Sequence, residues 1–81
     1  MKRNIELYGR LRDAGLGDCV TLVLPDGATA RQALDRLRRA LGRRATLLAG
    51  CALATDEAVL GPAERVPEHG RLAALPPVCG G

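Results

Sequence analysis

Hydrophobic and polar positions alternate in two separate runs in the first third of the chain. In residues 4–8 the aliphatic side chains, Ile5 and Leu7, have odd numbers, and in residues 19–24 three of the four, Val20, Leu22 and Leu24, have even numbers. A period of two is typical of a strand that buries one face. Gly15 and Gly17 favour a turn between the two runs. The pattern predicts an amino-terminal hairpin, with Ile5 and Leu7 on one face of the first strand and Val20, Leu22 and Leu24 on one face of the second.

The period changes to that of a helix after the turn Pro25-Asp26-Gly27. Thr29 and Gln32 have the spacing of a capping box, and Gly42 occupies the position of a glycine that ends a helix. The sequence therefore predicts an amphipathic helix over about residues 30–41. Its hydrophobic positions, within an arc of about 120°, are Ala30, Ala33, Leu34, Leu37, Ala40 and Leu41. Its polar face carries Arg31, Asp35, Arg36, Arg38 and Arg39.

The remaining elements are shorter. Residues 47–54 are apolar and predict a short strand that ends near Thr55-Asp56, and residues 58–60 predict another strand or its continuation. Residues 61–67 contain too much proline for a long helix. His69-Gly70 is read as a turn, and residues 71–75 as the last strand.

This order of elements is that of a β-grasp fold. A hairpin, one main helix, short strands and a late final strand predict a mixed sheet of four to five strands with the helix packed across it. The first and last strands are expected to pair in parallel at the centre, through a long crossover. A chain of 81 residues has room for a single domain, which we place at residues 1–75, followed by a flexible tail at 76–81.

The composition favours a function at the protein surface over one in an internal cavity. The chain is 47% hydrophobic and 26% charged, a globular balance, but Tyr8 is its only aromatic residue. The core is therefore predicted to be aliphatic. A domain of this size buries only about 60–65% of its unfolded surface, so a roomy internal active site is not expected.

The formal net charge is +3, and every basic residue except Lys2 is an arginine. Arg43-Arg44 extends the basic face of the predicted helix. Because no aromatic side chains accompany these arginines for base stacking, a solvated helix face is favoured over nucleic-acid binding. A basic binding module for nucleic acid remains a third hypothesis.

Cysteine usage and the first residues indicate a cytoplasmic protein. Three cysteines cannot all pair within one chain, and none forms a CxxC motif. Cys19 and Cys51 are expected to be buried apolar residues. With His69 and Cys79 they lack the paired spacing of a zinc site, so no metal is expected. The chain opens without the apolar segment of a signal peptide and has no run long enough to span a membrane.

The carboxyl terminus is the expected site of chemistry. Pro76 and Pro77 should stop the last strand, because proline lacks the N–H group that a strand needs. Val78-Cys79-Gly80-Gly81 should project from the domain and reach at most about 20 Å. A Gly-Gly ending passes through a channel too narrow for any Cβ. The sequence therefore predicts that the Gly81 carboxylate is presented inside the active site of another protein.

A carboxylate is a poor electrophile until it is activated, for example as an acyl-adenylate. Attack by sulfur on that adenylate leaves a thiocarboxylate, which is a nucleophilic sulfur donor. Attack by an amine instead gives an amide. The residues themselves permit either outcome.

The ending Pro76-Pro77-Val78-Cys79-Gly80-Gly81 resembles that of the small subunit of molybdopterin synthase, usually Pro-Pro-Val-(Ser or Ala)-Gly-Gly. The resemblance extends to residues 5–13, similar to the family's first strand and Arg-containing turn, and to residues 24–29 with the helix after them. It implies a ubiquitin-like β-grasp sulfur carrier that is not catalytic alone and holds no cofactor. A ubiquitin-activating-like enzyme would use ATP to adenylate Gly81, which would then become a thiocarboxylate.

The same resemblance implies the partners. The large synthase subunit, in a heterotetramer, would bind the tail and use its sulfur to build the dithiolene of molybdopterin. Leu7, Arg12 and Leu75 are expected to contact partners, although Leu7 and Leu75 are also plausible core residues. Delivery of sulfur to thiazole or cysteine synthesis is an alternative. A ubiquitin-like modifier joined to lysines through Gly81 is another.

Overall fold

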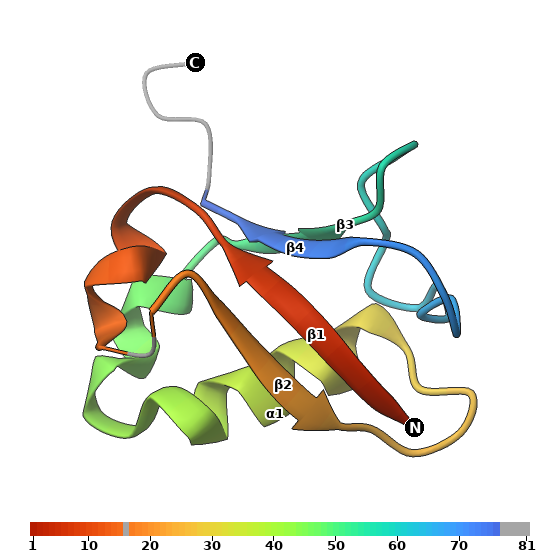
Figure 1. The fold of residues 1–81 in the computed structure, drawn as a ribbon, viewed down its shortest axis with the longest axis horizontal. Coiled ribbons are helices and arrows are strands. Elements are labelled where there is room, and N and C mark those ends of the chain that lie inside the picture. Colours follow the sequence, from red (N-terminus) through yellow and green to blue (C-terminus); the bar gives the residue numbers. More distant parts are fainter. Residues whose placement is uncertain (16, 77–81) are drawn as a thin grey trace.

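The computed structural model describes residues 1–15 and 17–76. They form a single four-stranded sheet with one α-helix packed across it (Figure 1). The elements, in chain order, are β1 (Lys2–Leu7), the 3₁₀ helix η1 (Gly9–Ala14), β2 (Cys19–Val23), α1 (Ala30–Leu41), the 3₁₀ helix η2 (Gly42–Leu48), β3 (Ala52–Ala54) and β4 (Leu72–Leu75). Pro76 is the last described residue, so the predictions for Pro77 to Gly81 lie outside the described residues.

The strand order is β2-β1-β4-β3. β1 pairs antiparallel with β2 and parallel with β4, with Ile5 opposite Leu72, and β3 pairs antiparallel with β4. The two ends of the domain thus meet at the centre of the sheet. The β-grasp architecture and its central parallel pair are confirmed.

The helix begins and ends where its caps place it. The Thr29 hydroxyl accepts from the Gln32 N–H, and the Gln32 side chain accepts from the Thr29 N–H at 2.8 Å. At the other end Gly42, with φ +57°, donates its N–H to the Arg38 carbonyl oxygen. This reciprocal capping satisfies N–H groups that a helix leaves free at its start. The predicted helix over residues 30–41 is confirmed.

The core is aliphatic, as the composition predicted. It lies between α1 and the face of the sheet that carries the odd-numbered residues of β1. Its fully buried large side chains come from both strands and helices: Ile5, Leu7, Leu11, Leu24, Leu37, Leu53 and Leu72.

Two 3₁₀ helices occupy segments for which the sequence predicted no helix, and the second takes Leu47 and Leu48 from the apolar run 47–54, so that the strand in this run is only Ala52–Ala54. Gly9, with φ +59°, turns the chain out of β1, and the Leu11 N–H then donates to the Tyr8 carbonyl oxygen at 3.2 Å. This turn buries Leu11 completely. In the second case, η2 continues directly from α1 and buries Leu48. Each short helix is held by one or a few inward leucines, too few to show a period.

Residues 58–60 return along β3. The Thr55 N–H donates to the Ala58 carbonyl oxygen at 2.9 Å, and the Leu60 N–H donates to the Leu53 carbonyl oxygen at 2.8 Å. A single bridge joins Ala54 and Val59. The segment therefore pairs locally with β3 without forming a fifth full strand.

Candidate functional site

The chain leaves the described domain at the end of the central strand β4. Because β1 and β4 are parallel, this end lies beside the end of β1 (Figure 1). Gly9 packs against Pro76 so closely that a Cβ on Gly9 would lie 3.0 Å from the Pro76 Cγ. The turn between β1 and η1 therefore packs against the point where the chain leaves the domain, at Leu75 and Pro76. We call this point the exit.

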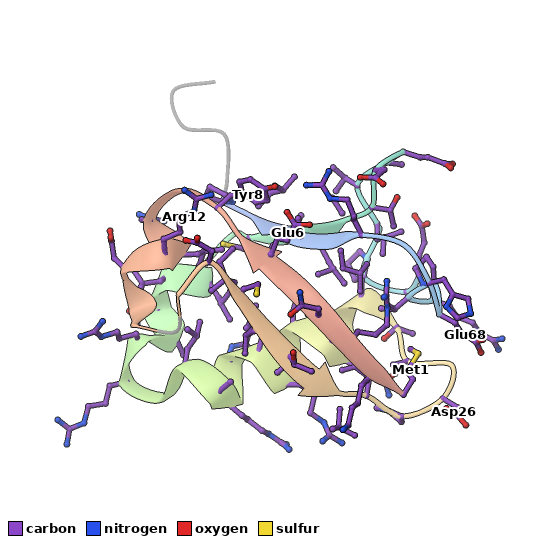
Figure 2. All side chains as sticks on the ribbon, in the orientation of Figure 1. Met1, Glu6, Tyr8, Arg12, Asp26 and Glu68 are labelled. Atoms are coloured by element: carbon purple, nitrogen blue, oxygen red, sulfur yellow. The ribbon has the colours of Figure 1, made fainter. Side chains whose placement is uncertain are left out.

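Arg12 is held at this end of β1 but remains exposed. Its Nε donates to the Leu7 carbonyl oxygen at 3.1 Å and lies 3.8 Å from a carboxylate oxygen of Asp18. Its guanidinium also lies over the ring of Tyr8, 5.6 Å from the centroid, a favourable cation–π distance. Figure 2 shows Arg12 and Tyr8 at the end of β1 near the exit. The arrangement presents a fixed positive charge there.

A polar cluster occupies the outer face of the sheet, opposite α1. Arg71 donates to both carboxylate oxygens of Glu6, from Nε and from a terminal nitrogen, each at 2.8 Å. The Tyr8 hydroxyl donates to Glu6 at 2.8 Å, and Arg71 also donates to that hydroxyl at 3.3 Å. Asp56 lies 3.7 Å from Arg71. We call Glu6, Tyr8 and Arg71 the outer-face cluster.

The hydrogen bonds fix the charge states of this cluster. Those from Arg71, and then that from Tyr8, favour the carboxylate and lower the pKa of Glu6 to about 2. The Glu6 carboxylate in turn raises the pKa of the Tyr8 hydroxyl and that of Arg71. At neutral pH the cluster is therefore a bidentate ion pair with a protonated tyrosine.

A hollow of about 260 Å³ surrounds the cluster on the outer face. It extends over β1, β4 and the end of β3, and it reaches Leu75 at the exit. Its lining combines charged and apolar groups: Glu6, Tyr8, Ala54, Thr55, Asp56, Arg71, Ala73 and Leu75. The exit thus adjoins a concave surface that is partly charged and partly apolar.

Of the three residues predicted to contact partners, one is buried in the core and two are accessible at the surface. Leu7 is only 1% exposed and lies in the core, so its assignment to a partner surface is wrong. Its odd position in β1 turns it toward α1. Leu75 is half-buried and lines the hollow, and Arg12 is exposed at the exit.

The outer-face cluster was missed by sequence reasoning. Glu6 has the outward parity of its strand, but its contact with Arg71 depends on the register between β1 and β4. That register pairs Glu6 with Ala73. It joins two strands that a long crossover separates in the chain, so that no local pattern predicts it. The available signal was the outward parity of Glu6 together with a basic residue at the start of the last strand.

The described cysteines differ from their prediction. Cys19 is exposed, because its side chain shares the outward parity of β2, opposite to that of Leu22. Cys51 is half-buried, and burial raises the pKa of its thiol. His69 is exposed in the predicted turn before β4, where Gly70 has φ +95°. Within residues 1–15 and 17–76, no three His, Cys, Asp or Glu side chains gather as a metal site would require.

The helices of the described segments are all too short or too polar to cross a membrane.

No protein-family model and no curated protein sequence matches this chain. Solved structures do resemble it. SAMP1 from Haloferax volcanii is 21% identical, with a TM-score of 0.77 over 100% of both chains. A second structure of that protein, small archaeal modifier protein 1, is 20% identical with a TM-score of 0.76, over 95% of this chain and 98% of the other.

A protein from Pyrococcus furiosus, assigned as molybdopterin converting factor subunit 1, is also similar. It is 18% identical, with a TM-score of 0.68 over 96% of this chain and 99% of that protein. At these identities the likeness concerns the fold. The chain has the ubiquitin-like β-grasp fold that is found in a small archaeal modifier protein and in a molybdopterin converting factor subunit.

Proposed function

We propose that this protein is a sulfur carrier that acts through the carboxylate of Gly81. The observation that carries the proposal is the position of Pro76 at the end of the central strand, beside the hollow. The sequence continues from there with Pro-Val-Cys-Gly-Gly. This combination supports the delivery of a narrow carboxyl terminus into a partner whose surface rests on the sheet.

The chemistry requires two displacements. The Gly81 carboxylate attacks the α-phosphorus of ATP held by an adenylating enzyme, which gives an acyl-adenylate and releases pyrophosphate. A sulfur nucleophile then attacks the carbonyl carbon, and AMP leaves with the bonding electrons. When the nucleophile is sulfide, loss of its proton leaves the thiocarboxylate directly. When it is a persulfide, the product is an acyl disulfide, and a thiol of the sulfur source then attacks the outer sulfur, which releases the thiocarboxylate and leaves a disulfide on the source.

The domain's own residues supply recognition in this scheme. Ordering a tail in a channel costs on the order of 1–2 kcal/mol for each residue, which docking of the domain must offset. The hollow offers the polar cluster for hydrogen bonding, and Leu75 and Ala73 for apolar contact. Arg12 adds a positive charge at the exit.

The finer proposal is that the carrier is the small subunit of molybdopterin synthase. The resemblance of the last six residues and the shared fold with a molybdopterin converting factor subunit support it. The partner would be the large subunit of that synthase, in a heterotetramer, and the sulfur would enter the dithiolene of molybdopterin. Thiazole or cysteine synthesis are the other destinations for the same thiocarboxylate.

Protein modification is the second candidate function. It is favoured by the likeness to the Haloferax volcanii protein, which is named a modifier and aligns over the whole of both chains. A modifier forms amides between Gly81 and lysine side chains. It therefore predicts species of higher mass that contain this chain in the cells that express it, whereas a dedicated sulfur carrier predicts none.

Removal of Gly81 tests the proposal. The variant lacking Gly81 should deliver no sulfur above background in a reaction with an adenylating enzyme, a sulfur source and the large synthase subunit. Its melting temperature should not change, because the deletion leaves every residue of the described domain in place. The matched control is Cys79→Ser, which alters the same tail and should retain sulfur delivery. Sulfur delivery by the Gly81-deleted chain would refute the proposal.

A further inference from the structure

The strand β2 has a free edge. The Leu24 N–H donates to the Met1 carbonyl oxygen and the Leu7 N–H to the Asp18 carbonyl oxygen, each at 2.7 Å. Hydrogen-bonded positions alternate along an antiparallel pair, so the even-numbered residues of β2 bond to β1. The backbone N–H and C=O groups of Cys19, Thr21 and Val23 therefore point away from the sheet, and no backbone partner meets them among the described residues.

This edge lacks the usual protection. Edge strands are commonly blunted by charged side chains, by proline or by a bulge. The segment Cys19–Val23 has no charge and no proline, its register with β1 is regular, and Val23 is 62% exposed. The free edge is thus able to accept another strand.

The neighbouring side of α1 is also uncovered. Ala40 falls on the same side of the helical wheel as the buried Ala33, yet it is exposed. Val20, whose side chain faces the helix layer, is only half-buried. Figure 1 shows the reason: the carboxyl-terminal half of α1 emerges beyond the free edge of β2. A strip between the two elements therefore lies open along that edge.

Positive charge lines this strip. A hollow of about 170 Å³ lies between Pro25, which follows β2, and the α1 residues Gln32, Asp35, Arg36 and Arg39. Residues 30–48 carry six arginines, of which Arg36 and Arg39 line this hollow, and the only acidic residue of the segment, Asp35, pairs with Arg38 at 2.7 Å. Because the net charge of the whole chain is only +3, the rest of the molecule is acidic. The charge beside β2 is therefore a local feature.

We propose that the free edge of β2 binds an extended, acidic segment of a partner protein by strand addition. The segment's backbone would pair with Cys19, Thr21 and Val23. Its alternate side chains would turn toward α1, where small apolar groups meet Val20 and Ala40. Its Asp and Glu side chains would lie beside Arg36 and Arg39. Strand addition supplies affinity through main-chain hydrogen bonds, and the side pockets supply specificity.

A second copy of this chain fits the edge less well. Antiparallel pairing of two β2 strands would continue the sheet across a two-fold axis. Both α1 helices would then lie on the same face, with their projecting arginine-rich ends toward each other. Like charges in such a contact are repulsive, whereas an acidic segment neutralises them.

The edge site is separate from the tail. The hollow at the exit lies over β1, β4 and β3, and β2 forms the opposite edge of the sheet. One partner can therefore take the tail while an acidic segment of another occupies β2. The inference does not depend on sulfur transfer.

The test uses the full chain and a synthetic peptide of about ten residues, the upper length of an ordinary strand. The peptide alternates valine with threonine at its centre and has Asp and Glu at both ends. Binding is followed by fluorescence anisotropy and by backbone amide NMR at low salt. We expect shift changes at Cys19–Val23, Arg36 and Ala40, with slower exchange of the Thr21 and Val23 amide protons. A peptide with lysine in place of its acidic residues should not bind.

Matched variants separate the backbone contribution from the charge contribution. Thr21→Pro removes an outward N–H that the domain does not use and should weaken peptide binding roughly tenfold, about 1.4 kcal/mol. Thr21→Val keeps that N–H and should leave binding unchanged. Arg36→Glu with Arg39→Glu should weaken binding by a similar factor, whereas Arg31→Glu, on the other side of α1, should have less effect.

Three results would overturn the proposal. The first is no binding of the acidic peptide at millimolar concentration. The second is unchanged binding of the acidic peptide to the Thr21→Pro variant, or equally tight binding of oligothymidylate to the unmodified chain. Either observation would show that the arginines attract any anion and that no strand is added. The third is a dimer of the free chain that Thr21→Pro dissociates, since the edge would then serve a second copy.

Discussion

The two faces of the central strands differ in burial and in polarity. Toward α1, β1 and β4 present Leu7, Leu72 and Ala74, each at most 1% exposed. Toward solvent the same strands and the residues next to their ends present the outer-face cluster and Leu75. Because side chains alternate along a strand, neighbouring residues belong to different surfaces. One face therefore stabilises the fold, and the other is the face that we propose for recognition.

The largest loss of stability should follow a substitution on the inner face. Leu7→Ala removes buried methyl groups from a site with no solvent access and should lower the free energy of unfolding by about 2–5 kcal/mol. Urea denaturation followed by circular dichroism measures this change. A loss below about 1 kcal/mol would mean that the two faces are not separated as described.

The matched change on the outer face is Leu75→Ala. It shortens a half-buried side chain beside the exit and should lower the free energy of unfolding by about 1 kcal/mol or less. The rate of sulfur delivery at limiting partner concentration should nevertheless fall, because Leu75 belongs to the proposed docking surface. Unchanged delivery would remove Leu75 from the docking surface.

The smallest effect should come from the ion pair. The pKa of Glu6 in the folded chain, about 2, lies below its ordinary value of 4.5, so its stabilising contribution is present above pH 4.5. That contribution is lost as the pH falls through about 2. Glu6→Gln should therefore be less stable than wild type at pH 7, and the difference should shrink toward pH 2. Thermal melts across this range measure it; a difference independent of pH would contradict the assigned pKa.

Local signals in the sequence predicted the parts of the fold that depend on neighbouring residues. Thr29, Gln32 and Gly42 marked the ends of α1, and alternation marked the hairpin. Contacts across the long crossover were not predictable in this way. The pairing of Glu6 with Arg71 joins residues far apart in the chain, and its register is fixed only by packing of the whole domain.

The remaining errors have the same origin. Parity separates the two faces of a strand but does not say which hydrophobic residues a second layer covers. Cys19 is exposed because its side chain lies on the outer face of β2, which no second layer covers, and Ala40 is exposed because the end of α1 projects past this edge strand. Leu7 was ambiguous between core and partner surface until α1 was seen to cover its face.

The intact mass of the chain tests the central claim most directly. The protein is incubated with ATP, an adenylating enzyme and a sulfur source, and fragmentation locates any change. The account predicts a gain of about 16 Da at Gly81, the exchange of one carboxyl oxygen for sulfur through an activated acyl intermediate. An unchanged mass with an enzyme that adenylates Gly81 would contradict the sulfur-carrier proposal and favour the modifier.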